Sequence, residues 1–170
     1  MGKRSDFERR KNDAYQTPPS AVKPLLQHLV GIDRFSEPCV GEGKLKSALE
    51  GCGFYCAHSG DIEAGFDAVT QMCNVEKTFD AIITNPPWTR SILHQMILVF
   101  QRIAPTWLLF DADWAHTKQA VPYLDQCSHI VSVGRVKWID DSPHTGKDNA
   151  AWYRFHAQHT GGPRFYGARV

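Results

Sequence analysis

The chain has 170 residues, of which 42% are hydrophobic and 22% are charged, and its formal net charge is +1. This length and composition support one packed core and leave no room for a second domain. No apolar stretch is long enough to span a membrane, and residues 1–12 are polar. We therefore expect a soluble, cytoplasmic protein without a secretory leader.

Positive charge is concentrated at both ends of the chain. Residues 1–24 carry six Lys or Arg against three acids, and residues 129–170 again carry six against three. If the two ends lie together in the folded domain, they form one basic patch that could bind the phosphate backbone of a nucleic acid. We expect a basic tail over residues 1–12, with three candidate contacts to nucleic acid: Arg9, Arg10 and Lys11. The alternative is that the tail is only a solvated segment.

The first half of the chain predicts helices and strands in alternation. Apolar residues recur at helical spacing between Pro18 and Val30, which indicates a first helix that begins with prolines. Four further elements follow in this part of the chain: a strand near Phe35, a helix over 44–52, a strand near Phe54 and a strand over 81–84.

The second half begins with the clearest helix, over 91–103, and continues the alternation. A buried strand over 106–110 and a helix over 118–127 follow. Two longer strands are then predicted over 130–139 and 150–157, joined by a polar loop. Such alternation favours an α/β fold with a mostly parallel sheet and helices on both faces, and the last two strands would form a C-terminal antiparallel hairpin. We expect residues 13–170 to form one domain.

Asn85-Pro86-Pro87-Trp88 follows the predicted strand over 81–84 directly and is the most informative tetrapeptide of the chain. Two prolines stiffen the loop and remove two backbone donors, so the loop offers carbonyl oxygens. Asn85 adds a side-chain carbonyl, and Trp88 adds a flat ring on which a base could stack. Acceptors placed in this way hold the protons of an amino group and leave its lone pair free to attack an electrophile. This chemistry suits methylation of an amine.

Three upstream segments complete a pattern. Glu37-Pro38-Cys39-Val40-Gly41-Glu42-Gly43 is a glycine loop after the first predicted strand, and glycines let the backbone pass close beneath a ligand. Asp61-Ile62 follows the second strand, and Gly65-Phe66-Asp67 is a turn beyond it. Tyr15-Gln16-Thr17-Pro18 precedes them all.

Together these segments resemble the amino-group methyltransferases that use S-adenosylmethionine, whose best-known members methylate N6 of adenine in DNA. The resemblance covers about residues 13–156 and implies a Rossmann-like class I methyltransferase fold with a seven-stranded sheet. It implies S-adenosylmethionine as the cofactor and ten residues that bind it: Tyr15, Thr17, Glu37, Pro38, Gly41, Gly43, Asp61, Ile62, Asp67 and Asn85. In that family an acid such as Asp61 holds the ribose hydroxyls and one such as Asp67 holds the adenine amino group.

The resemblance also implies the catalytic set, which consists of Asn85, Pro86, Pro87 and Trp88. Trp88 would stack on the target base, and Trp114, near the end of the strand over 106–110, is a candidate wall of the target pocket. Its alternative role is to cap the following helix. Cys39 follows a proline, as the nucleophile of cytosine-C5 methyltransferases does, but it lies in the cofactor loop and we expect no catalytic role for it.

Several alternatives remain open at this stage. Cytosine-N4 and RNA adenine offer similar amines, a protein-glutamine methyltransferase shares the Asn-Pro-Pro-aromatic motif, and a silent nucleic-acid-binding subunit would keep the fold without catalysis. We find no metal-ligating pattern and no separate target-recognition domain. Specificity would then come from loops, from the basic ends, from a second subunit, or from DNA that is already single-stranded. Chains of this size resemble methyltransferases of phages and prophages, which implies the cytoplasm of a bacterial or phage-infected cell.

Overall fold

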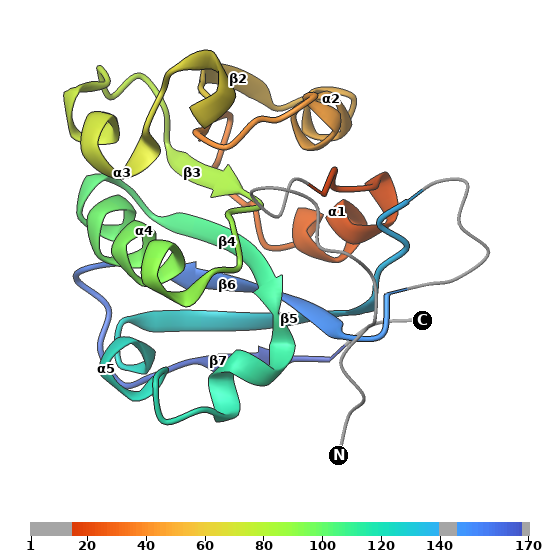
Figure 1. Ribbon diagram of the computed structural model, residues 1–170, viewed down its shortest axis with the longest axis vertical. Helices are drawn as coiled ribbons and strands as arrows, with labels where there is room; N and C mark the ends of the chain where they lie inside the picture. The colour runs from red at the N-terminus through yellow and green to blue at the C-terminus, as the bar shows by residue number, and fades with distance from the viewer. Residues whose placement is uncertain (1–14, 140–145, 168–170) are drawn as a thin grey trace.

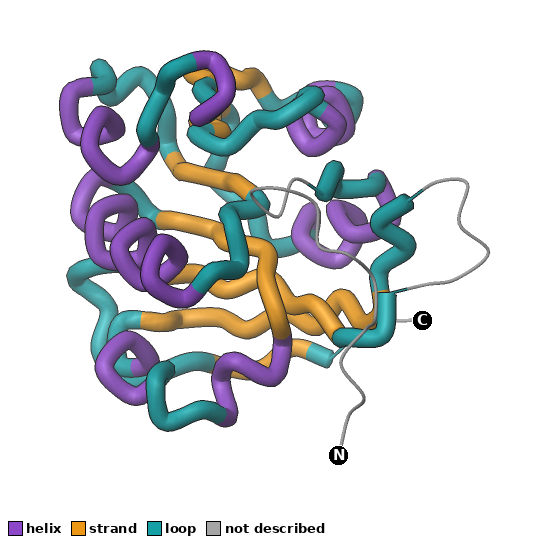
Figure 2. Tube along the Cα trace, in the orientation of Figure 1, coloured by secondary structure: helices purple, strands orange, loops and turns teal. Residues whose placement is uncertain are grey.

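The structure is a computed structural model that describes residues 15–139 and 146–167. Seven strands form one sheet in the order β2-β1-β3-β4-β6-β5-β7, with helices on both faces (Figures 1 and 2). Strand β6 is antiparallel to both of its neighbours, and the other neighbouring strands pair in parallel. The strands are β1 Arg34–Glu37, β2 Tyr55–Ser59, β3 Ala81–Thr84, β4 Thr106–Asp111, β5 Cys127–Arg135, β6 Asn149–Phe155 and β7 Arg164–Tyr166. The predicted α/β architecture with an antiparallel hairpin is confirmed.

The helices divide between the two faces of the sheet. The α-helices are α1 Pro19–Leu26, α2 Lys44–Glu50, α3 Ala68–Gln71, α4 Arg90–Ile103 and α5 Val121–Leu124, and the 3-10 turns are η2 Ile62–Ala64, η3 Met72–Asn74 and η4 Ala112–His116. One core cluster contains the buried residues of α1 and α2, and the other contains those of α3 and α4. No helix of the described residues has the length and apolar character needed to cross a membrane.

Strand β3 shows why a short apolar run becomes a central strand. All four of its residues are buried. Ile82 packs in the cluster on the α4 face, whereas Ile83 packs in the cluster on the α1 face. Because successive side chains of a strand point to opposite faces, both faces must be covered, and an uninterrupted apolar sequence results. Helix α4 covers its own face through Leu93, Met96, Ile97 and Phe100, which are spaced as one side of a helix.

The strand order reverses at β1, which pairs with β2 on one side and with β3 on the other. In open α/β sheets, ligands bind beyond the carboxyl ends of the strands at such a switch point. Glu37 is the last residue of β1 and Thr84 is the last residue of β3. The glycine loop and the Asn-Pro-Pro-Trp loop therefore leave the sheet side by side.

The helix predicted over 118–127 is wrong in extent. Its helical part, α5, spans four residues, Val121–Leu124, and Cys127 already begins β5. Pro122 lies in the first turn of α5, where a missing backbone N–H is tolerated, so the helix begins only just before it. The first predicted helix is also shorter than expected, since α1 ends at Leu26.

The C-terminal part of the sheet differs from the prediction in two places. Strand β5 ends at Arg135 rather than continuing to Ile139, shortly after a register shift between Ser132 and Gly134, where Gly134 takes a φ of 84°. Strand β7 was not predicted: it has three residues and follows the turn at Gly161-Gly162-Pro163, so it is too short to show alternation. Residues 140–145 of the predicted hairpin loop lie outside the described residues.

Candidate active site

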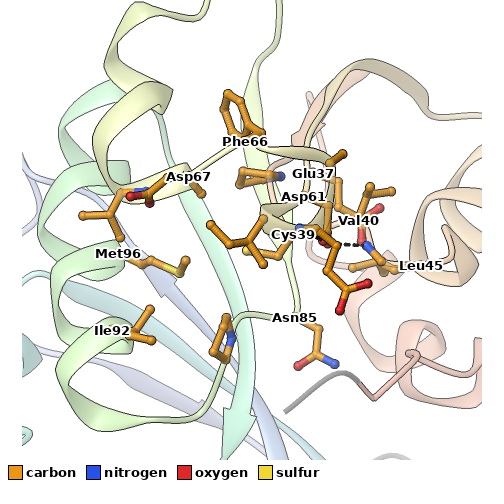
Figure 3. A pocket seen from close by; sticks show the side chains of 18 of the residues that line it. Glu37, Cys39, Val40, Leu45, Asp61, Phe66, Asp67, Asn85, Ile92 and Met96 are labelled. Atoms are coloured by element: carbon orange, nitrogen blue, oxygen red, sulfur yellow. Dashed lines mark hydrogen bonds between the residues drawn. The ribbon is translucent and has the colours of Figure 1, made fainter. Parts of the chain in front are cut away.

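A cleft of about 1110 Å³ opens at the carboxyl ends of β1 and β3 (Figure 3). Four segments line most of it: residues 15–17, the glycine loop from Glu37 to Glu42, the stretch from Asp61 to Thr70, and the loop at 85–89, which we call the target loop, with the first two turns of α4. Leu45 of α2 adds one more side chain. Three of the four segments directly follow a strand of the sheet. The cleft therefore exists because parallel strands release their loops at a common edge.

Nine of the ten residues predicted to bind the cofactor line this one cleft: Tyr15, Thr17, Glu37, Pro38, Gly41, Asp61, Ile62, Asp67 and Asn85. Gly43 does not. It is the N-cap of α2 with a φ of 82°, a left-handed conformation that other residues rarely adopt, and its carbonyl accepts from the Ser47 N–H. Gly43 thus turns the chain from the loop into the helix. Several lining residues were missed by the sequence analysis: Gln16, Phe66, Ile92, Gln95 and Met96 among them.

Asp61 braces the glycine loop. Its Oδ2 accepts from the Gly41 N–H at 2.8 Å, and its Oδ1 accepts from the Glu63 N–H at 2.9 Å, which caps η2. Each carboxylate oxygen keeps a second acceptor site for a ligand. Asp67 is placed similarly, since its Oδ1 accepts from the Val69 N–H and caps α3.

Gln16 crosses the same loop from the other side. Its Oε1 accepts from the Glu42 N–H at 3.2 Å. A Cβ added to Gly41 would lie 2.5 Å from Gln16 Nε2, so the end of the Gln16 side chain would have to move, and the φ of 51° at Gly41 is one that other residues rarely adopt. The glycine loop is therefore held from one side by the segment at 15–17 and from the other by Asp61.

Glu37 is a buried acid at the wall of the cleft. Its side chain is 1% exposed, and its Oε2 has no hydrogen-bond partner among the described residues. Burial raises the pKa of Glu37 to about 9, against the smaller lowering effects of the Lys46 backbone N–H and the Lys46 charge. The carboxyl group is thus neutral at pH 7 in the free protein, and a cation beside it would favour its charged form.

Glu37→Gln tests this burial through the pH dependence of stability. Between about pH 4.5 and 9 the unfolded chain ionises at Glu37 while the folded protein stays protonated. The parent therefore loses stability as the pH rises through this window, and the variant does not. We expect Glu37→Gln to be more stable than the parent at pH 8 by a few kcal/mol, at about 1.4 kcal/mol per pKa unit, and nearly equal at pH 4.

Urea unfolding at the two pH values measures this difference. Glu76→Gln is the matched control, because Glu76 is an exposed acid before β3 and its charge is not among those that act on Glu37, so its replacement should leave both free energies of unfolding within about 0.5 kcal/mol of the parent. An identical pH dependence in the parent and Glu37→Gln would show that Glu37 is ionised in the folded state.

Asn85 is fixed by both ends of its carboxamide. Its Nδ2 donates to the Tyr15 carbonyl at 3.0 Å, and its Oδ1 accepts from the Trp88 Nε1–H at 3.2 Å. One lone pair of Oδ1 remains available. Pro86 is buried, and Pro87 lines the cleft. The target loop is therefore rigid, and the acceptor Asn85 Oδ1 is held in a defined position.

Trp88 is half-buried beside the cleft rather than among the residues that line it. Its ring meets Trp138 edge-on, with ring centroids 5.6 Å apart and planes at 84°, and Trp138 lies 6.4 Å from the Tyr15 ring. Trp138 was predicted only as a strand residue. It belongs instead to the chain after β5, which brings it onto the target loop.

Trp114 lies in the core and not at the cleft. It is 0% exposed, packs edge-on against Phe110 and Tyr153, and donates from Nε1 to His94 Nε2 at 3.1 Å. Trp114 was expected to line a target pocket. It does not line the cleft, because η4 turns its side chain inward immediately after β4. Arg9, Arg10 and Lys11 lie outside the described residues.

Cys39 lines the cleft as a neutral thiol. Burial raises its pKa to about 12, so it stays protonated at neutral pH and is a poor nucleophile. Among residues 15–139 and 146–167, no group of three His, Cys, Asp or Glu side chains is placed to hold a metal ion.

The sheet order, the antiparallel β6 and the cleft at the β1 switch point define a Rossmann-like class I methyltransferase fold. No protein-family model and no curated protein sequence matches the chain. Several solved structures are similar to the chain. A type I restriction-modification system methyltransferase subunit from Streptococcus thermophilus is 10% identical, with a TM-score of 0.52 over 98% of this chain and 48% of that one.

A second solved structure, described as a class I S-adenosylmethionine-dependent methyltransferase from Listeria monocytogenes, is 11% identical, with a TM-score of 0.50 over 92% of this chain and 66% of that one. At such low identity the two likenesses establish the fold alone. The chain spans about half of the first protein and about two thirds of the second.

Proposed function

We propose that this chain transfers a methyl group from S-adenosylmethionine to the exocyclic N6 amino group of adenine in DNA. One observation carries the proposal: Asn85 and Pro87 of the Asn-Pro-Pro-Trp loop line the same cleft as the glycine loop and Asp61. A donor and an acceptor held there would meet at the switch point of the sheet.

The residues of the cleft fit this cofactor chemically. Asp61 offers oxygen acceptors for ribose hydroxyls, and the unpartnered Oε2 of Glu37 would gain a cationic partner. Ile62 and Phe66 supply apolar walls for a purine ring. The bound cofactor supplies the activated methyl group, so the protein has to align and stabilise.

The target amine is held by acceptors of the stiff loop. In the proposed mechanism Asn85 Oδ1 and the Pro86 carbonyl each accept one proton of the amino group, and Trp88 presents its ring to the base. The methyl group supplied by the bound cofactor would form its bond to the nitrogen lone pair in line as its bond to sulfur breaks, and S-adenosylhomocysteine would leave. The oxygens of Asn85 and Pro86 would stabilise the positive charge on the nitrogen until one of its protons passes to solvent. No covalent enzyme intermediate is required. A base within a duplex must first be flipped out, at a cost of a few kcal/mol.

One of the two structural neighbours supports DNA as the proposed substrate. The Streptococcus thermophilus protein is described as a subunit of a restriction-modification system. By analogy we propose DNA, duplex or single-stranded, as the partner of this chain, a second subunit as a source of target recognition, and the cytoplasm as its location.

Transfer of labelled methyl groups tests the proposal. Duplex DNA, single-stranded DNA, RNA and a protein extract are each incubated with the chain and labelled S-adenosylmethionine, and the modified nucleoside or residue is identified by mass spectrometry. N6-methyladenine in DNA supports the proposal, and the preferred strandedness indicates how the target is reached. Label at cytosine N4, in RNA or at a protein glutamine would contradict adenine in DNA as the substrate and would identify the actual acceptor. Cofactor binding without transfer to any acceptor would indicate a silent binding subunit.

Trp88→Phe separates the ring from its N–H group. The variant keeps an aromatic face but loses the bond from Trp88 Nε1 to Asn85 Oδ1. A hydrogen bond of this kind is worth about 0.5–1.5 kcal/mol, so we expect kcat to fall about two- to twelvefold while KM for the cofactor stays unchanged.

Steady-state kinetics of Trp88→Phe, Trp88→Ala and Tyr55→Phe measure this effect. Tyr55 is an exposed aromatic residue on β2, and its replacement should leave kcat unchanged. Trp88→Ala should lose more activity than Trp88→Phe because it also removes the ring. If Trp88→Phe turns over as fast as the parent, the indole N–H does not orient Asn85.

A further inference from the structure

A row of basic side chains crosses three strands at the edge of the sheet opposite to the cleft. Arg154 of β6 is the register partner of His129 of β5, and His129 is also the register partner of Arg164 of β7. Register partners on one face have Cβ atoms about 4.5–5.5 Å apart. The three side chains therefore stand directly beside one another.

All three side chains point to the α1 face of the sheet. Tyr153 and Phe155, on either side of Arg154, pack in the cluster on the α4 face, so alternation directs Arg154 the other way. Trp107, the register partner of Arg154 on β4, and Tyr166, two residues after Arg164, both belong to the α1 cluster. The row is thus a continuous feature of one face.

The two arginines have no acidic partner among the described residues. Arg154 Nη1 donates to the Ser128 hydroxyl at 3.0 Å, and the Arg164 guanidinium lies 5.1 Å from the centre of the Tyr166 ring. Each arginine is the register partner of His129, so the two guanidinium groups are separated by one strand and contribute positive charge to the same surface. Arg154 is also half-buried, and burial lowers its pKa. The positive charge of these two arginines is therefore not balanced by an acidic side chain of the described residues.

Aromatic rings cover the same surface. Tyr166 stacks on His129, with centroids 5.1 Å apart and planes at 11°, and the His28 ring lies 4.5 Å from Tyr166. Burial first, and then the charges of Arg154, His28, His159 and Arg164, lower the pKa of His129 to about 4. These groups come from β6, from the chain after α1, from the β6–β7 connection and from β7, so positive charge surrounds the ring from several elements.

We propose that Arg154 and Arg164 bind a phosphate group across His129. A guanidinium presents paired N–H donors that match phosphate oxygens, and two of them on either side of an imidazole would supply the charge and the donors together. The shared chemistry is that of a free phosphate ion or of a phosphodiester in nucleic acid. The site is separate from the proposed methyl transfer, because the row lies at the amino ends of β5 and β7 whereas the cleft lies at the carboxyl ends of β1 and β3.

NMR titration of the His129 ring in the full-length chain tests the proposal. Inorganic phosphate is one probe, and a short G·C duplex without adenine is the other, so that the proposed target pocket is not engaged. An anion beside the imidazole should raise the pKa of His129 by at least about one unit. A shift with both probes or with inorganic phosphate alone supports a free phosphate site, and a shift with the duplex alone supports a nucleic-acid contact. No shift with a large excess of either probe overturns the proposal.

Two arginine variants and a matched control locate the anion. Arg164→Gln, at an exposed position, should weaken phosphate binding at least about fivefold, and Arg154→Gln should do the same if it folds. Arg34→Gln is the control. Like Arg164, Arg34 lies next to a tyrosine ring, 5.2 Å from the centre of Tyr55, but it is near the opposite edge of the sheet and does not belong to the basic row. Unchanged binding in Arg164→Gln would place the anion elsewhere and overturn the assignment. Methyl transfer by Arg164→Gln serves as the separate readout of the proposed function.

Discussion

Replacing Asn85 with alanine is expected to lower the rate of methyl transfer at least about a hundredfold. The substitution removes the carbonyl that accepts from the reacting amine, and loss of one preorganised acceptor or donor at a site of developing charge typically costs a factor of 10²–10³. Cofactor affinity should fall only a few-fold, through loss of the bond from Asn85 Nδ2 to the Tyr15 carbonyl. The effect therefore lies mainly in kcat and not in cofactor binding.

Single-turnover transfer and calorimetric cofactor binding distinguish these two contributions. Asn74→Ala is the matched control, because Asn74 is an exposed asparagine in η3, away from the residues that line the cleft. Turnover by Asn85→Ala at the parental rate would remove Asn85 from the mechanism. Equal losses in affinity and in rate would instead assign to Asn85 the role of holding the segment at 15–17.

The parts of the site that follow strands were predictable from the sequence. An apolar run marks β3, and Phe35 followed by the glycine loop marks β1; the loop after a parallel strand must begin at the carboxyl edge of the sheet, whatever the rest of the fold does. Glu37, Asp61 and Asn85 therefore converge because each lies within one or two residues of a strand end. This local rule needs no knowledge of packing.

The parts that depend on distant contacts were not predictable. Trp138 reaches Trp88 across fifty residues of sequence, and Gln16 reaches the glycine loop from before α1. Trp114 shows the opposite failure: its place near a strand end was identified correctly, but the direction of its side chain depends on η4 and on the aromatic core. Position along the chain predicts an edge of the sheet, and side-chain direction requires the packing.

Asp61 stabilises the conformation of the glycine loop at Gly41. Gly41 has a φ of 51°, which favours glycine, but glycine also makes the loop conformationally costly to fix. Asp61 offsets this cost by accepting from the Gly41 N–H at 2.8 Å. The loop is thereby ordered before any ligand arrives, and preorganisation of this kind increases affinity without adding contacts.

Asp61→Ala is accordingly expected to weaken cofactor binding about a hundredfold. It removes the acceptor proposed for the ribose hydroxyls and releases the Gly41 N–H, and hydrogen bonds to a charged group are worth about 1.5–3 kcal/mol each. Calorimetry with S-adenosylmethionine measures the affinity. Asp67→Ala is the comparison, since Asp67 also caps a helix from the wall of the cleft but is not bonded to the glycine loop.

Melting of the ligand-free protein separates bracing from direct contact. If Asp61 acts by bracing alone, Asp61→Ala should lower Tm without ligand and Asp61→Asn should recover part of both stability and affinity, because the amide keeps one oxygen acceptor. If Asp61 also holds the ribose, Asp61→Asn should restore the melting temperature more fully than the affinity, since an amide accepts hydroxyl protons more weakly than a carboxylate does. Parental affinity in Asp61→Ala would exclude both roles and would move the proposed ribose contact to another acid of the cleft.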